Sequence, residues 1–242
     1  MHKEPLIMNI RTCYLVALLI IHSFFFSACN QPEHKDKASN LRIISDISAY
    51  NKLVKEDSSN QLVNLEKIIP GIILDIRYAT ENNFTGEQIY NSPKAFVRKP
   101  VAEALAIIQK ELNEKGLGLK VFDAYRPYTA TVKFYEVYPD TNFVAAPWKG
   151  SVHNRGCAVD ITLINLKTNK QLEMPTPFDD FTVKASHSYN DLPKKVLKNR
   201  QTLRDIMTKH GFQIYEAEWW HYGFKGWEKY ELMDISFDEL NN

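Results

Sequence analysis

Cysteine is scarce in this chain, with three residues among 242. Cys13 and Cys29 belong to an N-terminal stretch rich in apolar residues, which leaves Cys157 as the one thiol in the rest of the sequence. A single thiol forms no intramolecular disulfide, so the main body of the chain is not a disulfide-stabilised scaffold. Cys157 is most simply interpreted as a small buried residue of a strand.

An excess of charge of either sign is also missing. The formal net charge is +1, and charged residues make up 24% of the chain. Because the basic residues are scattered and not clustered with aromatic ones, we expect no nucleic-acid partner. A glycine-rich phosphate loop is absent too. With 44% hydrophobic residues, the composition fits one ordinary globular domain.

No hydrophobic run is long enough for a comfortable membrane span, which needs about 20 apolar residues. The run from Tyr14 to Phe26 follows Lys3 and Arg11 and ends at Ser27-Ala28-Cys29. This pattern is typical of a bacterial lipoprotein signal, with cleavage before Cys29 and a lipid on its thiol. Phe26 departs from the leucine that is usual at its position. A soluble secreted protein and an uncleaved anchor are the alternatives.

The chain then divides into three predicted parts: a signal over residues 1–29, a polar tether over 30–59 and a folded domain over 60–242. The tether prediction follows from a stretch rich in Lys, Asp, Ser, Asn and Gln and poor in aromatic residues. The expected location is the cell envelope, periplasm-facing or at the outer membrane. Contact with the membrane is expected only through the N-terminal lipid. The sequence does not indicate an oligomeric state.

Helices and strands interleave in the folded domain without a regular strand–helix–strand repeat, which favours the α+β class. Apolar periodicity predicts the following elements: strands at Ile72–Tyr78, Leu117–Ala124, Val159–Leu163 and Ile214–Trp219, and helices at Val101–Leu112, Tyr128–Val137 and Lys194–His210.

Two short stretches carry the candidate chemistry, Ser151–Asp160 and Glu218–His221. They contain two imidazoles, His153 and His221, together with the carboxylate of Asp160. Three such ligands around zinc leave one coordination position open, and water held there becomes a nucleophile near neutral pH. The other histidines are expected not to be ligands: His2, His22, His34, His187 and His210. A surface histidine and a solvent-facing aspartate are the simpler alternatives for each residue taken alone.

Strand periodicity tests whether these groups can meet. Cys157 and Val159 alternate with Asp160, which puts the carboxylate on the opposite face of the strand. His153 must turn back from the preceding loop. Glu218 lies three residues before His221, so the two would face opposite sides of a regular strand. We therefore predict a bulge, a turn or a strand end there. If Cys157 faced inward instead, its thiol would be a candidate for metal-linked inhibition.

The pattern Ser-x-His-x-x-Gly-x-Ala-x-Asp followed by Glu-x-Trp-His resembles the zinc D-Ala-D-Ala peptidases, which share a fold with the Hedgehog signalling domain. Within that group the chain is similar, from about Pro70 to Tyr222, to the D-alanyl-D-alanine dipeptidases of the type found in vancomycin resistance. Four further stretches carry this resemblance: Asp75–Thr80 with Asn83–Gly86, Asp123–Pro127, Thr176–Asp179 and the doubled Trp219-Trp220. The resemblance implies a Hedgehog/DD-peptidase-like α+β fold with a central, mostly antiparallel sheet and flanking helices.

The resemblance also implies one Zn²⁺ per chain in a catalytic domain over residues 60–242. Its ligands would be His153, Asp160 and His221. Glu218 would act as the base that takes a proton from the attacking water and gives it to the leaving amine. Arg126 would stabilise the negative charge that develops on the carbonyl oxygen.

For substrate binding, the resemblance implies that Ser151 and Asp179 meet the free ammonium of a D-amino-acid dipeptide. Asp180 adjoins Asp179, and both could be ordinary loop carboxylates. The group that binds the substrate carboxylate is not evident from the sequence. Arg77 and Tyr78 are candidates, and either could be structural.

The chain departs from the family pattern at Asn154, where serine is common, at Pro175, where glycine is common, and in a shorter segment between Arg126 and Ser151. These changes bear on substrate choice and not on the metal chemistry. The first hypothesis is hydrolysis of D-Ala-D-Ala or related dipeptides in the envelope, in peptidoglycan turnover and not in resistance. The alternatives are a D,D- or L,D-carboxypeptidase that trims stem peptides, and a binding module without catalysis.

Overall fold

The computed structural model describes residues 41–241. The predicted signal over residues 1–29, with Cys29, and the first part of the predicted tether lie outside the described residues. Within residues 41–241, no helix combines the length and the apolar character that a membrane crossing requires.

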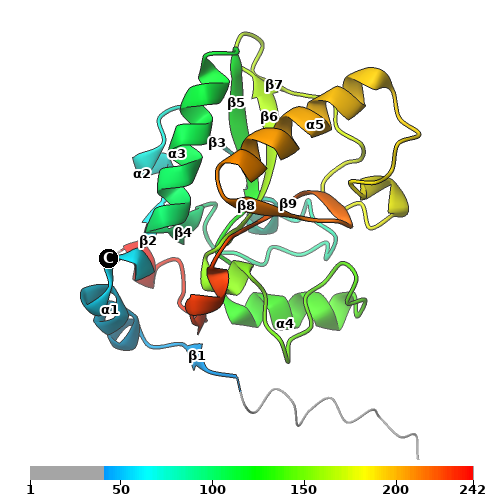
Figure 1. Ribbon diagram of the computed structural model, residues 1–242. Coiled ribbons are helices and arrows are strands. Elements are labelled where there is room, and N and C mark those ends of the chain that lie inside the picture. The colour runs from blue at the N-terminus through cyan, green and yellow to red at the C-terminus, as the bar shows by residue number, and fades with distance from the viewer. Residues whose placement is uncertain (1–40, 242) are drawn as a thin grey trace, which may run out of the picture. The chain divides into compact units, whose positions relative to one another are not determined.

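A central sheet of six strands organises the described part of the chain (Figure 1). Its order is β3-β5-β6-β9-β8, and β7 pairs with β6. The β3–β5 pair is parallel and the other pairs are antiparallel. The predicted α+β class with a mostly antiparallel sheet is confirmed. The strands of this sheet are β3 (Ile73–Leu74), β5 (Leu117–Asp123), β6 (Ala158–Asn165), β7 (Lys170–Gln171), β8 (Phe212–Tyr215) and β9 (Glu218–Phe224).

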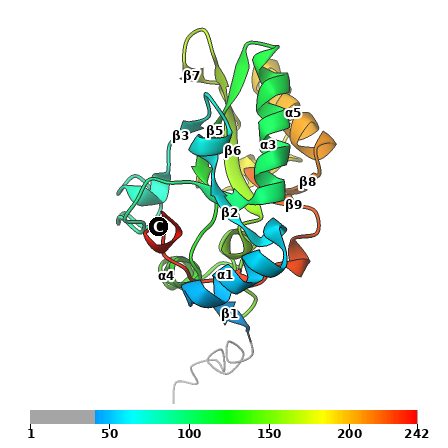
Figure 2. The same ribbon diagram turned by 90° about the vertical axis from the view of Figure 1, so that its left-hand side faces the viewer.

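Two long helices cover one face of the sheet, α3 (Lys99–Asn113) and α5 (Lys194–Lys209) (Figure 2). The buried stripe of α3 repeats at helical spacing, with Val101, Leu105 and Ile108 fully buried. Pro100 stands in its first turn, where a backbone N–H would have no intrahelical acceptor. A third helix, α4 (Tyr128–Val137), has the predicted bounds and lies beyond one end of the sheet (Figure 1).

Two predicted strands differ from the structure. The apolar run from Ile72 to Tyr78 forms only the short β3 and then a 3₁₀ turn over Arg77–Ala79. Its backbone leaves the sheet there because the carbonyl of Tyr78 accepts hydrogen bonds from the amides of Ile89 and Tyr90, both at 2.8 Å. The run predicted as Ile214–Trp219 is instead the end of β8, a turn and the start of β9.

The predicted tether also differs over the part that is described. Residues 47–56 form helix α1 (Ile47–Glu56), whose first turn is capped by the Asp46 carboxylate, accepting from the amide of Ala49 at 2.8 Å. Tyr50 is buried, and its hydroxyl accepts a hydrogen bond from the amide of Leu62 at 2.7 Å. A few apolar side chains at helical spacing are therefore enough to dock this polar stretch on the core.

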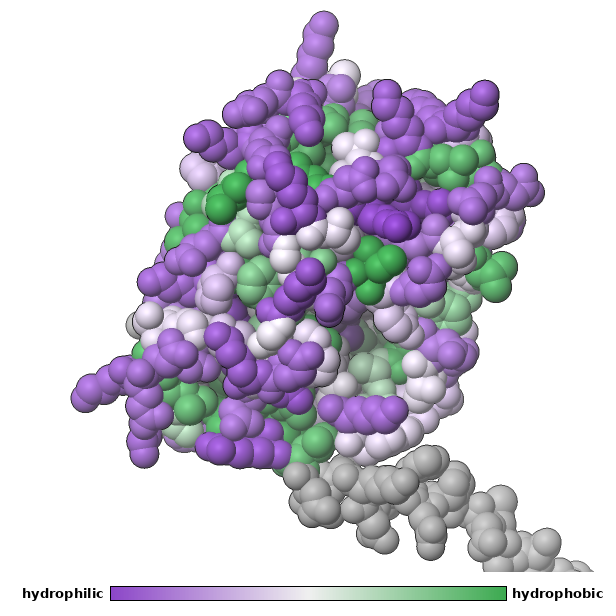
Figure 3. Space-filling model, in the orientation of Figure 1, coloured by the Kyte–Doolittle hydropathy of each residue, from purple (hydrophilic) through white to green (hydrophobic). Residues whose placement is uncertain are grey.

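Smaller elements complete the fold around these layers. β1 pairs in parallel with β10, and β2 pairs antiparallel with β4. The face drawn in Figure 3 is mostly hydrophilic, with hydrophobic residues in small separate groups. The bounds are β1 (Ile43–Ile44), β2 (Leu62–Asn64), α2 (Leu65–Ile68), β4 (Phe96–Arg98) and β10 (Leu232–Met233).

Candidate metal centre and substrate pocket

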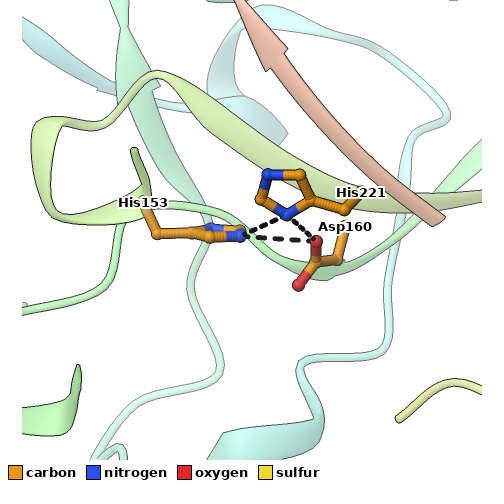
Figure 4. A group of neighbouring side chains, drawn as sticks. All are labelled: His153, Asp160 and His221. Atoms are coloured by element: carbon orange, nitrogen blue, oxygen red, sulfur yellow. Dashed lines mark hydrogen bonds and ion pairs between the residues drawn. The ribbon is translucent and has the colours of Figure 1, made fainter. Parts of the chain in front are cut away.

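Three predicted ligands meet at one point (Figure 4). Nε2 of His153 lies 3.1 Å from Nδ1 of His221 and 3.3 Å from Oδ1 of Asp160. Nδ1 of His221 lies 3.0 Å from the same carboxylate oxygen. All three side chains face one another, although they come from a loop and two strands.

The loop that carries His153 turns back as the sequence requires. His153 opens a single 3₁₀ turn that ends at Gly156, which has a left-handed φ of 68°. A Cβ at Gly156 would lie 2.5 Å from Cδ2 of Leu62, so only glycine fits both the conformation and the space. Nδ1 of His153 donates to the carbonyl of Ala124 at 2.6 Å. That bond leaves the lone pair of Nε2 directed at the other two ligands.

The other two ligands lie side by side in the sheet, since Asp160 in β6 is the register partner of His221 in β9. Glu218 is brought inward by an irregularity between β8 and β9. Ile214 pairs with Tyr222, but the next residue, Tyr215, pairs with Glu218. The extra residues on β9 form a bulge, and the predicted departure from a regular strand is confirmed.

These atoms fit a divalent metal ion. In a tetrahedral site with bonds of about 2.1 Å, neighbouring ligand atoms lie about 3.4 Å apart, close to the separations found here. Nδ1 of His153 is occupied by the Ala124 carbonyl, so the three atoms that face one another can all act as lone-pair donors: Nε2 of His153, Nδ1 of His221 and Oδ1 of Asp160. Burial lowers the pKa of His221 against the opposing effect of Asp160, which favours its neutral, metal-binding form. A cation would satisfy all three lone pairs.

The charge of Asp160 is suited to the same role. Burial by itself would raise the pKa of Asp160, but the adjacent His153 and His221 outweigh burial and hold the pKa below its ordinary value. The carboxyl group is therefore ionised while it is only 3% exposed. When both imidazoles present lone pairs instead, as metal binding requires, a bound cation has to replace that stabilisation.

Glu218 is buried at the edge of this group, with Oε2 at 4.0 Å from Nδ1 of His221. Burial raises the pKa of Glu218 well above its ordinary value, and the negative charges of Asp160 and Asp179 raise it further. This environment favours the protonated form of Glu218 more than solvent does. A cation beside it would favour ionisation again, so its proton affinity follows the local charge.

Arg126 is held in place by a buried ion pair. Its Nε and Nη2 atoms donate to Oδ2 of Asp123 at 3.0 and 2.8 Å. The guanidinium lies over the rings of Phe134 and Tyr78, at 4.6 and 5.4 Å from their centroids. Burial by itself would lower the pKa of Arg126, but Asp123 together with Tyr90, Tyr78 and Asp160 outweighs burial and raises that pKa, so the cation stays charged. Nη2 also lies 3.9 Å from Oδ2 of Asp160.

Ser151 and Asp179, the predicted contacts of the substrate ammonium, line the same pocket. Tyr78 donates its hydroxyl to Oδ1 of Asp179 at 3.0 Å, while Oδ2 of Asp179 is buried and has no hydrogen-bond partner in the part of the chain that the structure describes. Burial and then the charge of Asp160 raise the pKa of Asp179 to about 8. Oγ of Ser151 accepts from the amide of His153 at 3.2 Å. A cation bound at Oδ2 of Asp179 would favour the ionised carboxylate over the protonated form, and Ser151 also supports the loop.

One pocket of about 230 Å³ joins these groups. Its lining includes every site residue predicted from the sequence. They are Arg126, Ser151, His153, Asp160, Asp179, Glu218 and His221. Apolar side chains complete the walls, among them Phe134, Val144 and Trp220. The structure thus places the candidate ligands, base and substrate contacts around a single small cavity.

Three residues named above do not belong to the candidate site: Arg77, Cys157 and His210. Arg77 is paired with Asp75 at 3.1 Å and is not among the pocket-lining residues, whereas Tyr78 is. Cys157 precedes β6 and is not among the pocket-lining residues, and its thiol lies against the carbonyl of Arg155. Metal-linked inhibition through Cys157 is therefore not supported. His210 contacts Glu111 at 2.8 Å and lies away from the ligand group.

Two residues, Asp123 and Asn154, support the site although the sequence analysis assigns neither of them a role. Asp123, although part of a recognised stretch, is the partner that fixes Arg126. Asn154 is completely buried and ties two site residues together, because its Nδ2 donates to the carbonyl of Arg126 at 2.9 Å and its Oδ1 accepts from the amide of Ser151 at 2.7 Å. The spacing of Asp123 and Arg126, i and i+3, was a usable signal. Asn154 had no such signal.

Known proteins resemble this chain over most of its length. The family model described as Peptidase M15, D-ala-D-ala dipeptidase, matches residues 58–236. The D-alanyl-D-alanine dipeptidase of Escherichia coli K12 is 34% identical over 74% of this chain and 92% of its own length. The enzyme of the same name from Enterococcus faecium is 32% identical over 65% of this chain and 88% of its own length. The chain belongs to the peptidase M15 D-Ala-D-Ala dipeptidase family.

Proposed function

We propose that this protein is a zinc-dependent dipeptidase that hydrolyses D-Ala-D-Ala or closely related dipeptides. The observation that carries the proposal is the convergence of His153, Asp160 and His221 on one point beside buried Glu218. The pocket around them is small and has an acidic group, Asp179, on its wall. Family membership supports the same reaction class.

Zinc bound by the three ligands would supply Lewis acidity, polarising the scissile carbonyl and acidifying the attacking water. Glu218 performs the proton transfers. It accepts a proton from the attacking water and then protonates the amine that leaves. Its buried position suits both steps, because the local charge shifts its proton affinity as the reaction proceeds.

Arg126 stabilises the transition state. Negative charge grows on the former carbonyl oxygen as water attacks, and a fixed guanidinium gains most from that change. The hydrogen bonds to Asp123 and the flanking rings of Phe134 and Tyr78 hold the cation without reorganisation during the reaction.

Asp179 recognises the free ammonium of the dipeptide. Its Oδ2 is buried and has no partner in the described residues, so an ammonium restores a missing interaction. Substrates with an acylated N-terminus leave that oxygen unpaired, which disfavours them without a bulky gate. Tyr78 orients the carboxyl group by donating to its other oxygen.

A substrate panel tests the proposal. Zinc-loaded protein is incubated with D-Ala-D-Ala, L-Ala-L-Ala and N-acetyl-D-Ala-D-Ala, and released alanine is measured. Hydrolysis of the free D,D-dipeptide, with the acetylated compound poor by comparison, is expected. Preference for the acetylated compound or for longer stem peptides would instead indicate a carboxypeptidase.

The role of Glu218 is tested with Glu218→Gln, which keeps the side-chain shape and removes the proton acceptor. Turnover of D-Ala-D-Ala should fall by at least about a hundredfold, with zinc content unchanged. His210→Gln is the matched control outside the pocket and should keep wild-type turnover. Full activity in Glu218→Gln would remove this residue from the mechanism.

We further propose that the protein acts in the cell envelope, held there by a lipid on Cys29, and serves in turnover of peptidoglycan fragments. This proposal is supported by the residue pattern from Lys3 to Cys29. Cell fractionation with palmitate labelling tests it. A labelled membrane protein, with label lost in Cys29→Ala, is expected, whereas an unlabelled cytoplasmic protein would contradict it.

A further inference from the structure

The segment 139–148 forms one wall of the pocket. Phe143, Val144 and Ala145 line the cavity from this segment. The segment is tightly turned, because the amides of Phe143 and Val144 both donate to the carbonyl of Asp140, at 3.1 and 2.8 Å. Its position therefore decides how far the cavity extends from the metal ligands.

Each end of this segment is attached differently. Near residue 148, the Tyr128 hydroxyl of α4 donates to the carbonyl of Pro147 at 3.1 Å. At the other end, the Tyr215 hydroxyl donates to the carbonyl of Asn142 at 2.7 Å. Next to that bond, Phe143 stacks on Phe181 at 5.2 Å between ring centroids.

Tyr215 also lies beside the candidate metal site. It is the last residue of β8 and pairs with Glu218 across the bulge. Its ring lies edge-on to His221 at 5.8 Å and lines the pocket, while the residue is 40% exposed. The Tyr215 side chain thus connects β8, which pairs with the strand of Glu218 and His221, to segment 139–148.

We propose that Tyr215 is a positioning residue that holds segment 139–148 against the candidate metal site and thereby limits the substrate to a dipeptide. The inference rests on the proposed peptidase function and adds a structural cause for its size selectivity. The cavity of about 230 Å³ is below the roughly 300–1,000 Å³ of sites for drug-sized ligands. Without the bond, the Asn142 carbonyl can turn to water and Phe143 and Val144 move outward with it.

Tyr215→Phe tests the proposal because it removes the hydroxyl and keeps the ring beside His221. The KM for D-Ala-D-Ala should rise about two- to tenfold, the effect of one lost hydrogen bond, with kcat within about twofold of wild type. The rate with D-Ala-D-Ala-D-Ala relative to the dipeptide should increase by a similar factor. Zinc content should not change. Tyr230→Phe is the matched control, since the buried Tyr230 hydroxyl has no hydrogen-bond partner within residues 41–241.

Hydrogen–deuterium exchange separates this inference from the proposed function. Amides of residues 140–150 should exchange faster in Tyr215→Phe than in wild type or Tyr230→Phe, whatever the substrate is. Unchanged exchange would overturn the inference even if the protein cleaves D-Ala-D-Ala. Faster exchange with unchanged relative rates on dipeptide and tripeptide would also overturn it. If wild-type protein cleaves no dipeptide, the proposed function fails, and exchange alone decides whether Tyr215 holds the wall.

Discussion

His153 shows how one backbone carbonyl selects the atom that faces the candidate metal. Because Nδ1 donates to Ala124, Nε2 is the nitrogen left for the ion. His221 presents the other ring nitrogen, Nδ1, to the same point. The carboxylates divide in a similar way, since Asp160 is ionised by its neighbours while the pKa of Glu218 is raised. The surroundings of the two carboxyl groups, and not the difference between Asp and Glu, make Asp160 suited to be a ligand and Glu218 suited to be a base.

The ion pair of Arg126 leads to a prediction about turnover. In Arg126→Lys, one ammonium cannot replace the two hydrogen bonds to Asp123 and also face the substrate. The kcat for D-Ala-D-Ala should fall about a hundredfold or more, with a smaller change in KM. Arg77→Lys is the control. Because Arg77 lies outside the pocket, this variant should keep wild-type kinetics. Equal losses in the two variants would contradict the assignment.

The raised pKa of Asp179 predicts a pH effect on stability. The pKa is about 8 in the folded chain against an ordinary value of 3.8. Between these values the folded state binds a proton that the unfolded state has released, so this group lowers stability as pH rises from about 4 to about 8. The slope is at most about 1.4 kcal/mol per pH unit.

Asp179→Asn removes that slope. In metal-free protein, the unfolding free energy of the variant relative to wild type should increase from pH 5 to pH 8. Urea unfolding at several pH values measures it. A difference that stays constant across this range would show that the Asp179 carboxyl group is not protonated in the folded protein.

At the scale of elements, the irregular pairing of β8 with β9 gives the site a geometry that a regular strand cannot provide. A separation of three residues would place Glu218 and His221 on opposite faces, and the bulge brings both to the pocket. The tight turn after His153, which depends on Gly156, does the same for the third ligand. The candidate site is thus built where two elements depart from regular geometry.

Helix α1 leads to a prediction about stability. Tyr50→Phe leaves the amide of Leu62 without its acceptor in a buried environment. The free energy of unfolding should fall by about 1–3 kcal/mol. Lys52→Ala, at an exposed position of the same helix, should change it by less than about 0.5 kcal/mol. If Tyr50→Phe matches Lys52→Ala, the helix is not part of the cooperative fold.

The sequence predicts the long helices and the metal ligands, but not the contacts that connect distant segments. The bounds of α4 were predicted, and those of α3 and α5 within two residues, because their apolar spacing continues over several turns. The predicted strand at Ile72–Tyr78 was too long, since only Ile73–Leu74 forms a strand, because an apolar run indicates burial and not conformation. The contacts of Asn154 and Tyr215 bridge distant segments, and no local pattern encodes them.

At the scale of the whole molecule, the candidate metal site links segments that are distant in sequence. The loop of His153, β6 and β9 each provide one ligand. An ion that binds only when these segments are assembled stabilises the folded state. Metal binding and folding are therefore expected to be coupled throughout the domain.

This coupling predicts a thermal shift. With free zinc at about 100 times its Kd, the folded state gains about 2.7 kcal/mol, which raises Tm by roughly 5–10 °C for a domain of this size. His153→Ala should abolish the shift, and His210→Gln should retain it. Calorimetry with and without zinc measures the difference. A shift that survives in His153→Ala would place the ion elsewhere.

The most direct measurement is anomalous diffraction at the zinc edge from crystals of the zinc-loaded protein. One strong peak per chain is predicted, about 2.0–2.2 Å from Nε2 of His153, Nδ1 of His221 and Oδ1 of Asp160, with its open side toward Glu218. A peak at another set of side chains, or no peak at these three, would contradict the account.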